Sequence, residues 1–213
     1  MSGHFVTFEG GEGAGKSTQL AHLAAHLGQG AAEVVTTREP GGSPGAEAIR
    51  TLIVTGATDR WDARTEALLV AAARRDHVER TIRPALARGA WVLCDRFFDS
   101  TAAYQGMAGG VDAADIAWLR RFATDGLTPD LTIVVDVPVA VGMARVAARG
   151  EGQRQRFERR GGDFHAALRR AFASIAAAEP GRCRVVDGTR PAEALAAEIR
   201  AIVEDRFAAG ARR

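Results

Sequence analysis

A single lysine limits what this chain can fold into. Of the 28 basic residues, Lys16 is the one lysine and all the others are arginine. It lies in a glycine-rich run with the spacing of a phosphate-binding P-loop, Gly10-Gly11-Glu12-Gly13-Ala14-Gly15-Lys16-Ser17. Such a loop needs a compact, flexible ammonium beside the β- and γ-phosphates of a nucleotide, which a planar guanidinium does not replace. The sequence therefore predicts a nucleoside triphosphate site.

The residues around this run supply the strand and the helix that a P-loop requires. Residues 4–9 are largely apolar and β-forming, as in a buried parallel strand. After the loop, Leu20, Leu23 and Leu27 share one face of a predicted helix. The glycines let consecutive N–H groups turn toward an anion, and Ser17 is placed to bind Mg²⁺. We expect ATP to contact Gly10, Gly11, Glu12, Gly13, Ala14, Gly15, Lys16, Ser17 and Thr18.

Short apolar segments and amphipathic segments alternate along the whole chain. Strands are predicted at 5–9, 34–38, 91–95, 131–136 and 184–187. Helices are predicted at 16–28, 45–55, 65–88, 112–124, 139–149, 162–178 and 191–208. The fold class is therefore α/β, a doubly wound five-stranded parallel sheet of the P-loop NTPase type with helices on both faces. With no repeat and no Ser/Pro-rich linker, residues 1–213 are predicted to form one domain.

Composition excludes several classes of partner. A net charge of +2 is too small to attract nucleic acid by bulk electrostatics. The sequence shows no signal peptide and no long apolar segment, so we expect a cytoplasmic protein without a membrane partner. A P-loop regulatory NTPase is a distant alternative. The chain contains no asparagine, which rules out the Asn-Lys-x-Asp motif that switch GTPases use to recognise guanine.

The carboxyl ends of parallel strands meet at one edge of the sheet, where ligands of such folds bind. The residues predicted there are Glu9, Arg38, Glu39, Asp95, Arg96 and Asp136. Asp95 suits the Mg²⁺ shell, while Arg96 can reach a phosphate. Tyr104 and Gln105 follow, offering a flat face, a hydroxyl and an amide to a sugar or base. Taken alone, a core tyrosine and a surface glutamine would explain that pair equally well.

Four segments of the chain together resemble the bacterial thymidylate kinases, members of the P-loop nucleoside-monophosphate kinase family. They are residues 8–17, 37–43, 95–105 and 149–160. The resemblance implies ATP-dependent phosphorylation of dTMP to dTDP in dTTP synthesis, with Mg²⁺ as cofactor and a homodimer as the assembly. An alternative is a kinase of the same fold for another or modified pyrimidine nucleoside monophosphate.

The same resemblance assigns roles to particular residues. Arg50, Arg74 and Arg96 are expected to hold the acceptor phosphate, and Glu12 to contact the 3′-hydroxyl of its sugar. The other residues expected to contact the acceptor are Val70, Ser100, Thr101, Tyr104 and Gln105. Val70 stands where a phenylalanine usually stacks on thymine, Ala73 replaces a usual aspartate and Gly109 a frequent arginine. Phe97, Phe98 or Trp61 could supply the missing aromatic face.

An arginine-rich segment at about 149–161, with glycines at both ends, is predicted to form a short lid. As a charge run alone, it would be a solvated face. Gly13 and Ala14 follow Glu12 where some thymidylate kinases carry an arginine, so the resemblance moves the catalytic arginine into the lid. The residues expected to be catalytic are Lys16, Glu12, Arg96, Arg149, Arg154 and Arg156. Arg145 is expected to stack on adenine.

Overall fold

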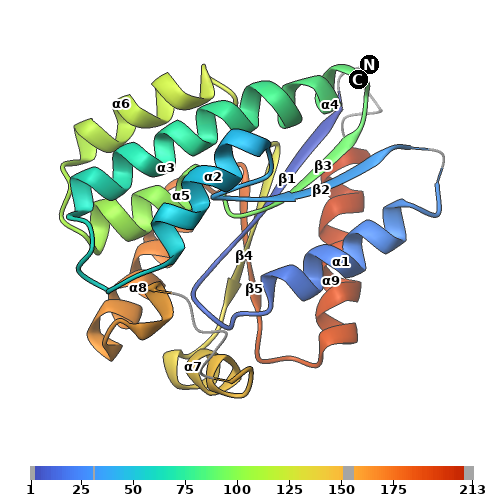
Figure 1. Ribbon diagram of the computed structural model, residues 1–213. Helices are drawn as coiled ribbons and strands as arrows, with labels where there is room; N and C mark the ends of the chain where they lie inside the picture. The colour runs from blue at the N-terminus through green and yellow to red at the C-terminus, as the bar shows by residue number, and fades with distance from the viewer. Residues whose placement is uncertain (1–2, 31, 151–155, 209–213) are drawn as a thin grey trace.

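A five-stranded parallel sheet forms the centre of the protein (Figure 1). The structure is a computed structural model that describes residues 3–30, 32–150 and 156–208. Its strands are β1 (His4–Glu9), β2 (Val34–Arg38), β3 (Trp91–Asp95), β4 (Leu131–Asp136) and β5 (Cys183–Asp187), in the order β2-β3-β1-β4-β5. The predicted fold class is confirmed, and each strand lies within one residue of its predicted bounds.

Helices follow each strand and cover both faces of the sheet. They are α1 (Lys16–Leu27), α2 (Pro44–Val54), α3 (Ala63–His77), α4 (Arg83–Ala87), α5 (Phe98–Thr101), α6 (Ala113–Thr124), α7 (Val139–Ala147), α8 (Gly162–Ala178) and α9 (Ala192–Ala208). Figure 1 shows α1 and α9 on one side of the sheet and the group α2, α3, α5 and α6 on the other.

Two helical regions differ from the sequence expectation. The continuous helix predicted at 65–88 is instead α3, a π-helical segment at Val78–Ile82 and α4. Pro84, which lacks an N–H group, interrupts the regular ladder there and stands in the first turn of α4. The run after Asp95, for which no helix was predicted, forms α5 and a second π-helical segment at Ala102–Met107.

Alternate residues of β1 face opposite layers of the core. Val6 and Phe8 pack with Leu23 of α1 and Ile199 of α9. On the other face, Phe5 packs in a cluster that includes Val78, Ile82, Val92, Cys94, Phe97 and Phe98. Because both faces are covered, β1 is buried from Phe5 to Glu9. The central strand thus holds the P-loop rigidly at its carboxyl end.

The P-loop turns by using glycines in conformations that other residues rarely adopt. Gly10 has φ +133°, and a Cβ there would lie 2.3 Å from the carbonyl oxygen of Val135 in β4. Gly13 has φ +68°, and a Cβ there would lie 2.1 Å from the carbonyl oxygen of Gly142 in α7. The loop backbone therefore packs directly on its neighbours, which fixes the direction of Glu12 between these glycines.

Within the described part of the chain, no helix has both the length and the apolar character that crossing a membrane would require.

The glycine contacts generate a stability prediction. We expect Gly10→Ala to lower the free energy of unfolding by about 2–4 kcal/mol, because it adds backbone strain to a steric clash with Val135. Gly11→Ala is the matched control, since a Cβ at Gly11 would meet nothing within 4 Å. Urea unfolding of both variants measures the difference. Equal losses in the two variants would contradict the packing described here.

Candidate functional site

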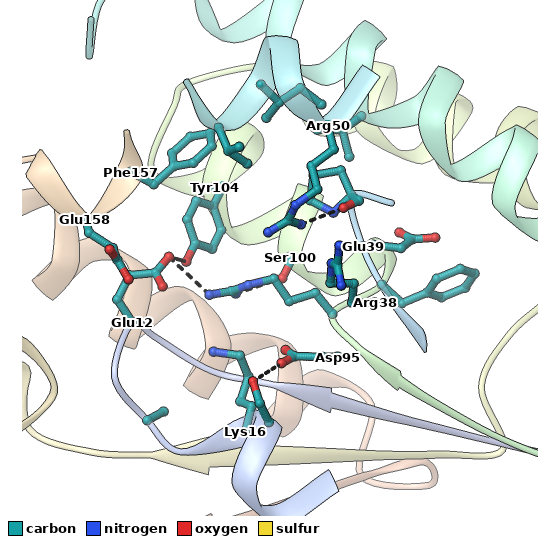
Figure 2. Close-up of a pocket in the computed structure, with 18 of the residues that line it drawn as sticks. Glu12, Lys16, Arg38, Glu39, Arg50, Asp95, Ser100, Tyr104, Phe157 and Glu158 are labelled. Atoms are coloured by element: carbon teal, nitrogen blue, oxygen red, sulfur yellow. Dashed lines mark hydrogen bonds and ion pairs between the residues drawn. The ribbon is translucent and has the colours of Figure 1, made fainter. Parts of the chain in front are cut away.

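A cavity of about 460 Å³ opens at the carboxyl ends of β1, β2 and β3 (Figure 2). The P-loop forms part of the cavity wall, and Val70 of α3, Tyr104 and Gln105 also line it. Lys16 and Arg50 enter it from opposite sides. Among the described residues that line it, seven are basic and four are acidic. The cavity lining therefore has an excess of basic residues, which suits it to bind anions.

Lys16 is buried at the first turn of α1, and its ammonium folds back over the loop. Its Nζ donates to the carbonyl oxygens of Gly10 at 3.1 Å and Gly11 at 2.9 Å. Burial lowers the pKa of Lys16, as does Arg96, whereas nearby carboxylates act in the opposite direction. The ammonium is therefore held where loop-bound phosphates would meet it.

Ser17 and Asp95 form the pair of hard oxygen donors that the sequence predicted for a metal. Ser17 Oγ donates to Asp95 Oδ2 at 2.5 Å beside the P-loop. Across the described ranges, no group of three or more His, Cys, Asp or Glu side chains is arranged to hold a metal. One hydroxyl and one carboxylate nevertheless fit Mg²⁺, which commonly takes its remaining ligands from phosphates and water.

Arg96 connects the P-loop to α5. Its Nη1 donates to Gly10 O and to Ser100 Oγ, each at 3.1 Å, and its Nη2 donates to Glu12 at 3.1 Å. Its backbone has φ +73°, in the left-handed region that non-glycine residues seldom occupy. Strain of that kind costs about 1–3 kcal/mol and is typical of functional sites.

Glu12 is an ionised acceptor inside the cavity. Besides Arg96, it accepts a hydrogen bond of 2.5 Å from the hydroxyl of Tyr104. Burial alone would raise the pKa of Glu12, but Arg96, Lys16 and the Tyr104 hydroxyl lower it to about 2. This carboxylate therefore stays charged at neutral pH and can accept a further hydrogen bond from a ligand hydroxyl.

Glu9, at the end of β1, is fully buried and accepts hydrogen bonds from residues at the start of α5. Its oxygens accept from the backbone N–H of Phe97 at 2.7 Å and from Ser100 Oγ at 2.6 Å. Burial and the neighbouring Asp99 raise the pKa of Glu9 to about 7, although Arg96 and these hydrogen bonds oppose the rise. Glu9 thus titrates near neutral pH.

The three arginines expected at the acceptor phosphate all line the cavity, but they differ in burial and in their hydrogen-bond partners. Arg96 is described above, and Arg50 Nη1 donates to the carbonyl oxygen of Pro40 at 2.6 Å. Arg74 is fully buried, and its Nε donates to Glu39 at 2.7 Å. Because Glu39 balances its charge, Arg74 is mainly part of the wall in this structure.

Two of the strand-end residues lie in the cavity wall, although the family resemblance gave them no role. Arg38 and Glu39, at the end of β2, both line the cavity. The strand-end rule indicated them, although the motifs gave them no role. Asp136 does not line the cavity, since it pairs with Arg169 of α8 through bonds of 2.8 and 2.7 Å.

The lid arginines are separated by the structure. Arg145 and Arg149 line the cavity, where Arg145 Nη2 donates to Gly188 O at 3.0 Å and Arg149 pairs with Glu158. Arg156 is buried on Glu66 of α3 and is not among the lining residues. Arg154 lies outside the described residues. Of the three expected catalytic lid arginines, Arg149 is therefore the one that the described structure brings to the cavity.

The aromatic residues that line the cavity include one that the sequence did not single out. Phe157 lines the cavity, and its ring lies edge-on to Tyr104 with centroids 5.5 Å apart. Phe97 also reaches the wall. Two other aromatic residues proposed from sequence, Phe98 and Trp61, do not line it. Phe98 instead packs beneath Arg120, and Trp61 Nε1 donates to Leu52 O. The sequence contains one signal for Phe157, which is its position within the arginine-rich segment predicted to form the lid.

Comparison with known proteins extends the resemblance over nearly the whole chain. The family described as thymidylate kinase matches residues 8–199. The thymidylate kinase of Caulobacter vibrioides is 54% identical over 205 residues, covering 96% of this chain and 98% of the relative. That of Bradyrhizobium sp. is 53% identical over 206 residues, with coverages of 96% and 91%. The solved thymidylate kinase structure from Ehrlichia chaffeensis has a TM-score of 0.75 at 33% identity, covering 95% of this chain and 99% of that chain.

The position of Lys16 generates a kinetic prediction. We expect Lys16→Ala to lower phosphoryl-transfer turnover at least about 100-fold while the fold survives, because charge compensation in the transition state is lost. His22→Ala, on the same helix but outside the cavity wall, is the control. Steady-state kinetics and circular dichroism measure the two effects. Near-normal turnover in Lys16→Ala would exclude the P-loop assignment.

The raised pKa of Glu9 generates a prediction about stability and pH. Because the folded pKa of about 7 exceeds the ordinary 4.5, protonated Glu9 favours folding, and this contribution declines as pH rises from about 4.5 to 7. Glu9→Gln should remove that decline. The unfolding free energy of Glu9→Gln minus that of wild type should therefore increase by on the order of 1–3 kcal/mol as the pH rises from 4.5 to 7.5.

Urea unfolding across this pH range measures the Glu9 effect, with the exposed Glu193→Gln as control. Parallel pH profiles for wild type and Glu9→Gln would show that the Glu9 carboxyl is not the titrating group.

Proposed function

The chain belongs to the thymidylate kinase family, and on that basis we propose that it phosphorylates dTMP to dTDP with ATP, a step in dTTP synthesis. The observation that carries this proposal is one cavity whose wall combines the P-loop, with Lys16 and Glu12, and the acceptor-side residues Tyr104 and Gln105. A single anion site would need only the loop. Acceptor groups across the same cavity favour a transferase over a regulatory NTPase.

Phosphoryl transfer asks the protein to align two nucleotides and to neutralise charge that spreads over phosphate oxygens. An oxygen of the acceptor monophosphate attacks the γ-phosphorus of ATP, and the bond from that phosphorus to the β,γ-bridging oxygen breaks. In our proposal, Lys16 and the loop N–H groups hold the donor phosphates. Arg96 and Arg50 hold the acceptor phosphate, and Arg149 stabilises the group in transfer.

A magnesium ion fits this scheme through Ser17 and Asp95, which lie together beside the P-loop. When bound, it would supply positive charge to the phosphates of ATP. Arg145 reaches the P-loop end of the cavity, consistent with a contact to adenine.

Glu12 and Tyr104 support a deoxyribose beside the P-loop. Because the Glu12 carboxylate is ionised, it can accept a hydrogen bond from the 3′-hydroxyl of the acceptor sugar. The Tyr104 hydroxyl is already bonded to Glu12, so the ring is held in one orientation. We propose that this fixed ring crowds the position of a 2′-hydroxyl.

The amide of Gln105 supports a base with a donor at N3. Its Nε2 donates to the buried Glu66 at 3.2 Å, and the residue lines the cavity. With Nε2 engaged by Glu66, we propose that Gln105 Oε1, which can only accept, receives the hydrogen bond from the base. Thymine and uracil carry N3–H, whereas N3 of cytosine is an acceptor. The pocket therefore favours the first two bases.

We also propose that the protein is a homodimer, assembled through α3 and α6. These two helices pack together and expose Leu68 on α3 and Trp118 and Phe122 on α6, and exposed apolar patches often mark protein–protein contacts. The rings of Trp118 and Phe122 stack with centroids 5.1 Å apart. A cytoplasmic location stays a prediction.

Substrate choice tests the proposed function. In a coupled assay of ADP release we expect dTMP to be the best acceptor among dTMP, dUMP, UMP, CMP and AMP. CMP should fall at least about 100-fold below dTMP in kcat/KM, because its N3 leaves the Gln105 contact unmade and its ribose carries the crowded 2′-hydroxyl. UMP shares that ribose, so the ratio of CMP to UMP isolates the contribution of the base. Turnover that favours another pyrimidine monophosphate over dTMP would support the same-fold alternative instead.

The same assay on Val70→Phe examines the base pocket. An added ring facing the base should lower the KM for dTMP by roughly tenfold, as expected from base stacking on an aromatic side chain. Val70→Leu adds volume without a ring and is the control. A higher KM in Val70→Phe would mean that Phe157 or Phe97 already occupies the stacking position.

A further inference from the structure

Glu66 is a buried carboxylate that lies close to the cavity but is not among the residues that line it. It stands in the first turn of α3 with a side chain that is 3% exposed. Three side chains meet it there. Arg156 forms an ion pair with Oε1, Arg160 donates to Oε1 at 3.2 Å, and Gln105 donates to Oε2 at 3.2 Å. Neither the family motifs nor the sequence pattern assigned Glu66 a role.

Arg156 depends on Glu66 for its charge compensation. Its guanidinium is fully buried, and among the described residues its Nε and Nη1 have no hydrogen-bond partner. Its backbone N–H donates to the carbonyl oxygen of Val54 at 3.1 Å, at the end of α2. Removing Glu66 would therefore leave a buried cation without its carboxylate, and this segment would lose its principal ionic attachment to α3.

Residues 156–160, which we call the docked segment, carry part of the cavity wall. Phe157 lies beneath the guanidinium of Arg156, which is 4.8 Å from the ring centroid, and packs edge-on to Tyr104. Glu158 lines the cavity and forms an ion pair with Arg149. A chain of contacts thus runs from Glu66 through the docked segment to the lid arginine that faces the cavity.

We propose that Glu66 is a positioning residue, which docks residues 156–160 against α2 and α3 and thereby places both Arg149 and Gln105 toward the acceptor nucleotide. Glu66 does not touch substrate itself. One carboxylate links the lid arginine and the amide beside the base, so the orientation of each depends on the same group. This inference rests on the proposed function.

The kinetic test uses Glu66→Gln, which keeps the shape of the side chain and removes its charge. We expect kcat with ATP and dTMP to fall about 10- to 100-fold, the effect typical of a displaced catalytic group. The KM for dTMP should rise, because Gln105 loses its fixed orientation. The dissociation constant for ATP, measured without acceptor, should change by less than about twofold, since the P-loop contacts remain.

A second measurement follows docking itself in the substrate-free protein. The N–H of Arg156 is bonded to Val54 O only while the segment is docked, so hydrogen–deuterium exchange of a peptide that covers residues 152–164, in which Arg156 is not one of the first two residues, reports on docking. We expect at least about tenfold faster exchange there in Glu66→Gln, with β1 and β3 unchanged. Arg64→Gln, which breaks an exposed ion pair with Asp115 on the same helix, is the control and should match wild type.

A double-mutant cycle identifies the partner. If Glu66 acts through Arg156, Glu66→Gln should lower kcat by no more than about twofold in an Arg156→Gln background. Additive losses, or a loss of kcat without faster exchange, would overturn the proposal.

If Glu66→Gln does not fold, Arg160→Gln replaces it as the test variant. Because removing this half-buried arginine leaves the contact between Glu66 and Arg156 in place, kcat and exchange should change in the same direction but by less. Unchanged exchange in Arg160→Gln would also overturn the docking. A wild-type protein inactive on dTMP would refute the proposed function, whereas the exchange comparison would still decide the docking.

Discussion

The site depends on the interaction of one guanidinium with the P-loop. Arg96 bridges a loop carbonyl, the loop carboxylate Glu12 and the hydroxyl of Ser100, and it does so from a left-handed backbone. Without that bridge, the partly buried carboxylate of Glu12 would lose its ion pair with Arg96, and the loop would lose its link to α5. The strained backbone is tolerated because β3 and the buried residues after it hold the chain on both sides of Arg96.

Carboxylates elsewhere in the site pair with several of the arginines. Glu39 pairs with Arg74 and Glu66 with Arg156, and both guanidinium groups are buried. Arg50 has a carbonyl partner, and Arg96 shares its charge among several groups. Cations whose charge is not fully balanced can bind phosphate. A carboxylate partner alone does not decide the role, because Arg96 pairs with Glu12 and Arg149 with Glu158 while both line the cavity. Arg156 differs because it is buried away from the cavity wall.

Much of the fold was predictable because its signals are local. Buried parallel strands are short apolar runs, so β3 and β4 have the predicted bounds, as does the less buried edge strand β2. The errors occurred where a local exception overrides the periodic pattern. Pro84 divides a helix whose apolar spacing is continuous, and the helical turns after Phe97 are stabilised by contacts with Glu9, a residue 88 positions earlier in the chain. Helical periodicity cannot reveal a hydrogen bond of that range.

The sequence alone determined the nucleotide-binding loop, the parallel sheet and the set of groups at the strand ends, since each follows from residue types at fixed spacing. The tertiary structure decided which of those groups share one cavity. It placed Arg149 in the wall, Arg156 on Glu66, and Phe157 beside Tyr104, although the arginine-rich segment looked uniform in sequence. The physical reason is that charge pairing and ring packing depend on distances in space. Glu66 and Arg156 are 90 positions apart, and only folding brings them into contact.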